Sequence, residues 1–197
     1  MSGTFSRMSL AKFARMQVAP VFEKSFSSIY GRPCWQVEEG VGSFLTLEFG
    51  KPHLEVREPI TASKRFGATV QESLARRNVV VHGDWHLWIY CCEWEVLFRN
   101  RRIGDSSTKT RVRRAAEFLD GQVLTRFSIS PRTVECAFFF DLGGTLKTRP
   151  YDRECEQWLL YEPRHKVLTL RGDGQYKYVR SDTPEDRGAW HPIAPHS

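Results

Sequence analysis

Apolar and polar residues alternate with a period of two along most of the chain. Because successive side chains of a strand point to opposite faces of a sheet, this pattern predicts strands with one buried face. The connections at Gly50 and Gly143 are too short for a crossover, so they predict antiparallel pairing. The predicted strands cover residues 35–38, 43–59 (strand, turn, strand), 79–88, 93–100, 122–128, 133–141, 145–149, 157–161, 166–171 and 176–180.

One segment has the helical period instead. Between Ser106 and Leu119, apolar residues recur at helical spacing at positions 112, 115, 116 and 119, which predicts a helix with one buried stripe. Ser106 or Ser107 is suited to cap its start, and Asp120-Gly121 to end it. Shorter helices are predicted at residues 22–30 and within the polar segment 61–78.

The two halves of the chain resemble one another. "LTLEFGKPHLEVR" aligns with "AFFFDLGGTLKTR", which matches Gly50 with Gly143, and further on Trp85 matches Trp158. Self-similarity of this kind predicts an internal duplication. We therefore expect an α+β fold, mainly antiparallel β, with two similar halves of about four strands (residues 35–103 and 120–180) and a connecting helix at about 106–119.

The pattern also predicts the domain organisation. Residues 1–30 are basic, lack acids before Glu23, and are expected to form a helical extension. Residues 31–180 are expected to form a single β-rich domain, and residues 181–197 a polar tail on its surface.

Composition bears on the size of the core and on the cellular location of the protein. The chain has 197 residues, of which 41% are hydrophobic, so it can bury a sizeable core. Its five cysteines are an odd number without a CxxC pair, which favours a reducing, cytoplasmic location. No apolar run reaches the roughly 18 residues that a bilayer span needs, so no membrane partner is expected.

A family resemblance rests on the second half. "LDGQVLTRFSISPRTVECAFFFDLGGTLKT", followed by "QWLLYEP" and "VLTLR", resembles small β-rich bacterial domains of unknown function, some of which are immunity proteins of toxin systems. The matching residues are those that pack a core. The resemblance implies an intracellular bacterial protein that binds a partner rather than one that catalyses a reaction, and it assigns no functional residue.

The segment "VVVHGDWHLWIYCCEW" carries the strongest candidate chemistry. In a straight strand His82, Asp84 and His86 would share one face, and two imidazoles with a carboxylate can hold zinc or iron. A divalent metal is therefore one hypothesis, although same-face neighbours lie about 6–7 Å apart and a bend at Gly83 would be needed. The alternative is a core strand whose polar end lies at a rim.

A second segment resembles a catalytic motif. "FFFDLGGTLKT" resembles the strand and first aspartate of haloacid-dehalogenase-type phosphatases, but Gly143 replaces their second aspartate. Without that acid the proton transfer has no donor, so no catalytic role is assigned to Asp141.

Basic residues suggest a binding surface. The net charge is +6, and the segment 99–114 holds seven basic residues and one acid. An acidic protein or a nucleic acid is a suitable partner for such a surface. The residues expected to form it are Arg76, Arg77, Lys109, Arg111, Arg113 and Arg114.

Three functions follow from these features. The leading hypothesis is a non-catalytic, immunity-like binding domain with a protein partner and no cofactor. The alternatives are a basic protein that associates with nucleic acid and a metal-dependent enzyme that uses His82, Asp84 and His86.

Overall fold

The computed structural model describes residues 18–40, 44–61, 65, 67–184 and 187–194. The helices in these residues are α1 (Pro20–Ser27), α2 (Ala68–Leu74) and α3 (Lys109–Leu119). The strands are β1 (Cys34–Glu39), β2 (Leu45–Phe49), β3 (His53–Arg57), β4 (Asn78–His82), β5 (Trp85–Ile89), β6 (Cys92–Phe98), β7 (Arg101–Asp105), β8 (Leu124–Ile129), β9 (Cys136–Phe140), β10 (Gly144–Pro150), β11 (Glu156–Glu162), β12 (Lys166–Arg171), β13 (Gln175–Arg180) and β14 (His191–Pro192). The expected α+β fold with mainly antiparallel strands is confirmed.

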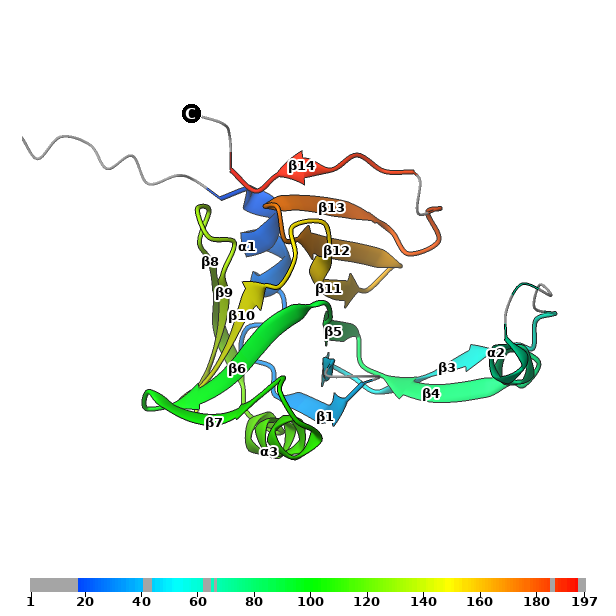
Figure 1. The fold of residues 1–197 in the computed structure, drawn as a ribbon, viewed down its shortest axis with the longest axis horizontal. Coiled ribbons are helices and arrows are strands. Elements are labelled where there is room, and N and C mark those ends of the chain that lie inside the picture. Colours follow the sequence, from blue (N-terminus) through cyan, green and yellow to red (C-terminus); the bar gives the residue numbers. More distant parts are fainter. Residues whose placement is uncertain (1–17, 41–43, 62–64, 66, 185–186, 195–197) are drawn as a thin grey trace, which may run out of the picture.

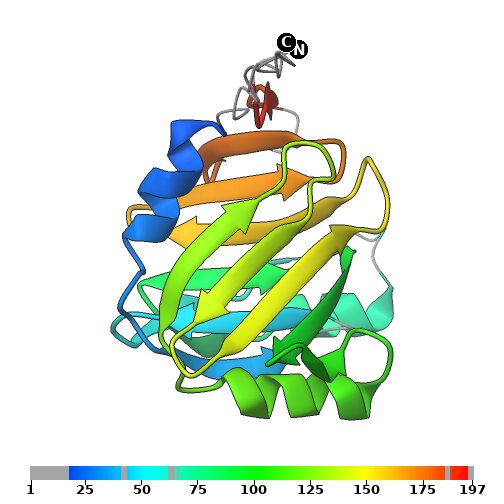
Figure 2. The same cartoon turned by 90° about the vertical axis from the view of Figure 1, so that its left-hand side faces the viewer.

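Two antiparallel sheets form the body of the protein. The larger has the order β1-β2-β5-β11-β12-β13-β14, and the smaller has the order β7-β6-β10-β9-β8. In Figure 1 the smaller sheet is one layer, the larger sheet is the next, and the hairpin β3-β4 projects from the body. Figure 2 shows the smaller sheet face-on, with α1 along one edge and α3 across one end.

The core lies between the inner faces of the sheets. Alternate residues of the central strands point inward, for example Leu87 and Ile89 of β5, and both are fully buried. Aromatic rings fill the space at one side, where the rings of Phe26 and Phe127 stack with centroids 3.9 Å apart and Trp158 meets both edge-on. The predicted core strand is therefore confirmed for β5.

Both ends of the described chain join this core. This corrects the expected boundaries of the N-terminal extension and of the C-terminal tail. Phe22 and Phe26 of α1 are buried against Trp158, so residues 20–30 belong to the domain and not to an extension. Residues 1–17 of the expected extension lie outside the described residues. In the tail, β14 pairs with β13 and Ile193 is buried, because the polar sequence contains one short apolar segment.

Helix α3 has the predicted stripe. Val112, Ala115, Ala116 and Leu119 are all buried. The helix starts later than expected, because the side chain of Thr108, rather than a serine, accepts the backbone N–H of Arg111 at 3.4 Å. Gly104 lies beneath it, where an added Cβ would come within 2.2 Å of the Arg111 carbonyl oxygen, so this contact requires glycine.

The two halves share one topology. Each consists of a helix and five strands: α1, β1, β2, β5, β6 and β7, then α3, β8, β9, β10, β11 and β12. In each half, three strands enter one sheet and the last two enter the other. Reciprocal hydrogen bonds join the halves, since Gly31 N–H donates to the Leu124 carbonyl at 3.0 Å and Gly121 N–H donates to the Cys34 carbonyl at 2.8 Å.

The details of the expected correspondence were wrong. The strands of Trp85 and Trp158 are not equivalent, because β5 and β11 are neighbours in one sheet, with Trp158 opposite Ile89. By topology β11 corresponds to β6, and the third residue of each is a buried tryptophan, Trp94 and Trp158. The matched glycines do hold similar places, since Gly50 follows β2 and Gly143 follows β9, each with positive φ.

The hairpin β3-β4 interrupts this symmetry. In the second half, residues 141–143 join β9 directly to β10, whereas in the first half residues 50–84 lie between β2 and β5. This insertion contains β3, α2 and β4, and we call its residues 53–82 the arm. Within the described residues β3 and β4 pair only with one another, and every residue of β3 is exposed.

Candidate metal centre at the base of the arm

Three polar side chains converge where the arm meets the larger sheet. Glu48 lies on β2 and His86 lies directly opposite on β5, both on the face that points away from the core. His82 is the last residue of β4. In a straight strand His82 and His86 would be about 13 Å apart, but the chain turns at Gly83 and Asp84, and the two ring centroids are 5.0 Å apart.

Glu48 is hydrogen-bonded on both carboxylate oxygens. Its Oε1 lies 2.8 Å from Nδ1 of His82 and 2.6 Å from Nδ1 of His86, and its Oε2 accepts the backbone N–H of Gly83 at 2.8 Å. One nitrogen from each ring and one carboxylate oxygen all lie within 4.8 Å of one another. The arrangement provides two imidazoles and one carboxylate at a single point.

The carboxylate is buried yet charged. Glu48 is only 3% exposed. Burial alone would raise the pKa of Glu48, but the hydrogen bonds from His86, Gly83 and His82 outweigh it and hold this pKa below its usual value. A buried negative charge therefore faces two imidazoles, which is also the electrostatic environment that a cation would occupy.

Asp84 does not join this cluster, so the straight-strand interpretation of the three-residue set needs correction. Its Oδ2 accepts the backbone N–H of Lys51 at 2.8 Å, which fixes the connection after β2. The reason is the turn itself: a Cβ at Gly83 would come within 2.3 Å of the Phe49 carbonyl oxygen, so the chain passes close to β2 at this point. Glu48 supplies the carboxylate that sequence reasoning assigned to Asp84.

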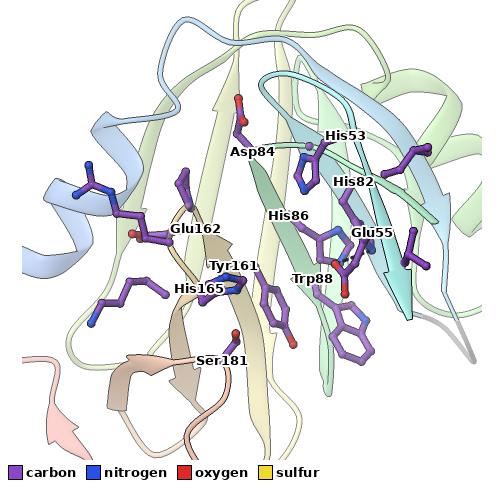
Figure 3. A pocket seen from close by; sticks show the side chains of 16 residues that line it. His53, Glu55, His82, Asp84, His86, Trp88, Tyr161, Glu162, His165 and Ser181 are labelled. Atoms are coloured by element: carbon purple, nitrogen blue, oxygen red, sulfur yellow. Dashed lines mark ion pairs between the residues drawn. The ribbon is translucent and has the colours of Figure 1, made fainter. Parts of the chain in front are cut away.

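A pocket of about 710 Å³ opens beside the cluster. Figure 3 shows His53, Glu55, His82 and His86 on one side of this space and Tyr161, Glu162 and His165 on the other. His53 lies opposite His82 across the hairpin. The arm therefore supplies one wall of the pocket, and the ends of β11 and β12 supply the other.

The second wall carries its own charges. Glu162 Oε2 accepts the hydroxyl of Tyr178 at 2.8 Å, and burial together with this carboxylate raises the pKa of Tyr178 to about 12. Burial also raises the pKa of Tyr161, whose ring lies 5.7 Å from that of His86. The phenols of both tyrosines therefore remain neutral donors at neutral pH.

The predicted basic residues do not form one surface. Arg76 and Arg77 lie at the arm, where Arg77 forms an ion pair with Glu58 at 2.7 Å. The other four lie on α3, which Figure 1 places well apart from α2 and the arm. On α3, Arg111 contacts Asp105 at 3.1 Å, whereas Lys109, Arg113 and Arg114 are exposed.

Sequence reasoning missed Glu48 and Tyr161. The alternation in "LTLEF" does indicate that Glu48 leaves the core face. Its meeting with His86 depends on β2 pairing with β5 across an insertion, and Tyr161 faces His86 only because β11 pairs with β5. Neither pairing has a local signal in the sequence.

Comparisons with known proteins do not add to this description. No family model, curated protein or solved structure matches the chain. None of the described helices has the length and apolar character that crossing a membrane requires.

Proposed function

We propose that the protein binds a divalent transition-metal ion through Glu48, His82 and His86 and presents it to a small molecule in the adjoining pocket. The observation that carries this proposal is the convergence of the three ligand atoms within 4.8 Å at the edge of a 710 Å³ pocket. This is the third of the functions expected from the sequence, with Glu48 in place of Asp84.

The ligand set favours particular ions. Two imidazoles and one carboxylate suit Zn²⁺ and Fe²⁺, and three protein ligands leave a position for water or substrate. Such an ion polarises a bound oxygen or lowers the pKa of bound water. We therefore infer metal-assisted chemistry on an oxygen-containing small molecule.

Contacts around the three ligands support the proposal. Metal-binding histidines usually direct their second nitrogen to a carboxylate or carbonyl. Here Nδ1 of His82 faces Glu48, and the Glu55 carboxylate lies near its Nε2, at 3.9 Å, which is beyond hydrogen-bonding distance. The Gly83 N–H holds the second oxygen of Glu48, and a metal bound to Oε1 would replace the two hydrogen bonds that this oxygen accepts from the imidazoles.

The test is equilibrium binding of Zn²⁺ and Co²⁺ to the full chain after treatment with a chelator. We expect one tight site, a visible Co²⁺ spectrum typical of low coordination number, and weaker binding at acidic pH, since ligands must lose protons. His82→Ala and His86→Ala should each weaken binding at least tenfold. His165→Ala, which alters the same pocket but not the cluster, should leave it unchanged.

Two results would contradict the proposal. One is the absence of stoichiometric binding to the folded wild-type chain. The other is binding that His165→Ala weakens as much as His86→Ala, because the metal would then lie elsewhere in the pocket.

A binding role for helix α3 is a second candidate. Within the described residues, Lys109, Arg113 and Arg114 form no ion pair, and they are exposed and lie outside the buried stripe. This arrangement supports an acidic protein partner, as expected for an immunity-like domain, or the phosphates of a nucleic acid.

A further inference from the structure

Exposed apolar side chains concentrate in the arm. Eight large apolar side chains are exposed among the described residues, and all but Leu142 and Tyr151 lie between residues 53 and 82. The six in the arm are Leu54, Val56, Ile60, Val70, Val79 and Val81. This distribution marks the arm as a surface that the protein leaves uncovered.

Four of the six form one continuous face. In the register of the hairpin, Leu54 lies opposite Val81, and Val56 lies opposite Val79. Residues two apart on a strand share a face, so these two cross-strand pairs lie side by side. They are between 38% and 66% exposed.

The charged and polar residues occupy the other face of the hairpin. His53 and Glu55 alternate with the apolar residues of β3, and His82 lies across from His53. His53 and Glu55 of this face line the pocket, and so do Leu54 and Val56 of the apolar face. A partner that covers the apolar face therefore also borders the pocket.

An isolated two-stranded hairpin is at best marginally stable in water, and it needs a further layer on its apolar face. The described part of the chain supplies no such layer: α2 buries none of its residues, and β3 and β4 pair only with each other. A second molecule that packs on this face would supply such a layer.

We propose that this layer is a second copy of the same chain, with the two hairpins packed face to face through Leu54, Val56, Val79 and Val81. The face is uncharged, so a neutral apolar surface complements it better than an acidic partner does. The copy offers an identical face, which is what a two-fold contact requires. Because the arm projects from the body, the basic α3 helices of the two copies need not approach one another.

The area suits a weak contact. The four side chains of the face expose roughly 350 Å² per copy, so two copies bury about 700 Å², which is in the range of weak, transient association. We therefore expect a reversible dimer whose population rises with protein concentration.

Sedimentation velocity of the full chain from about 1 to 200 µM tests the proposal through mass action. The mass should rise from that of one 22.9 kDa chain towards that of two. Because the contact is apolar, raising the salt from about 0.15 to 0.5 M should not dissociate it. The measurement is made in the presence of chelator, so that its outcome is independent of metal binding.

Two variants locate the interface. Val56→Lys with Val79→Lys places like charges opposite one another in the centre of the face and should weaken dimerisation at least tenfold. Val56→Thr with Val79→Thr keeps the β-branched shape that suits the hairpin, and it should weaken dimerisation less than the lysine pair does. This second variant tests the interface even where the lysine pair disrupts the hairpin. Leu142→Lys, which replaces an exposed apolar side chain on the turn between β9 and β10, is the control and should dimerise as the wild type does.

A wild-type chain that stays monomeric across the whole concentration range would overturn the proposal. So would a dimer that both double variants leave intact, because its interface would lie elsewhere. Neither result affects the proposed metal centre, which is tested by metal titration alone.

Discussion

Replacing Glu48 by glutamine tests whether the buried carboxylate holds the base of the arm to the sheet. The carboxylate accepts three hydrogen bonds, two from imidazoles and one from the Gly83 backbone. A carboxamide has the same shape but only one acceptor oxygen, so its NH₂ group must face at least one N–H donor. Breaking a buried charged contact of this kind should lower the free energy of unfolding by on the order of 3 kcal/mol at pH 7.5.

The pH dependence provides a sharper test. The pKa of Glu48 is lower in the folded state than its usual value, so its contribution is present above the unfolded-state pKa of about 4.3. That contribution is lost as the pH falls through the lower, folded-state pKa. The difference in stability between the wild type and Glu48→Gln should therefore be full above about pH 5 and shrink as the pH is lowered further.

Urea unfolding in the presence of chelator, followed by tryptophan fluorescence at several pH values, measures both effects. Glu58→Gln is the control, because Glu58 also forms an ion pair but its side chain is 63% exposed. Its effect should stay below about 1 kcal/mol. A Glu48→Gln variant as stable as the control, or a stability difference that does not change with pH, would refute this account of the cluster.

Two further predictions concern α3. Leu119→Ala removes a fully buried side chain and should lower the free energy of unfolding by about 2–5 kcal/mol in urea titrations, whereas an effect below about 1 kcal/mol would contradict the observed packing. Arg113→Glu with Arg114→Glu should reduce retention on a heparin column without changing the circular dichroism spectrum, because both side chains are exposed. Unchanged retention of the double variant would exclude α3 as the anion-binding surface. If a nucleic acid is the partner, the affinity of the wild type should fall as salt rises, with a log–log slope of about −0.9 per phosphate contacted on a duplex.

Features encoded by local periodicity were predictable from the sequence. The stripe of α3 is an example, because a period of 3.6 with alanine and leucine on one side has no competing interpretation. Strand β7 was not predicted, since Arg101 and Arg102 give it no apolar alternation. It is an edge strand of the smaller sheet, where charged side chains can stay exposed.

The metal hypothesis shows the limit of such reasoning. Periodicity treats residues 79–88 as one strand, whereas β4 ends at His82 and Gly83 passes so close to the Phe49 carbonyl that a Cβ would not fit there. The turn after β4 places the His82 ring next to the His86 ring and directs the Asp84 carboxylate to the backbone of Lys51. The sequence identified the two histidines because their residue type is informative, but the third ligand depends on strand pairing between distant segments.

The broken symmetry of the fold indicates which residues serve function rather than stability. Glu48 is the second-last residue of β2, and the corresponding position in β9 is Phe139; His86 is the second residue of β5, and the corresponding position in β10 is Thr145. The second half therefore builds the same strands without an acid or an imidazole at these places. Since the scaffold folds there with an apolar and a small polar residue, it does not require a buried carboxylate facing two histidines.

The same comparison applies to the arm. The second half joins β9 to β10 with a three-residue turn, so the insertion at residues 50–84 is not needed to connect equivalent strands. It nevertheless contributes His82 to the cluster, one wall to the pocket and the uncovered apolar face. Features that depart together from an otherwise repeated scaffold, and that meet at one place, are best explained by a common role. We therefore expect that shortening the arm to a turn like that after β9 would leave a folded domain without metal binding and without self-association.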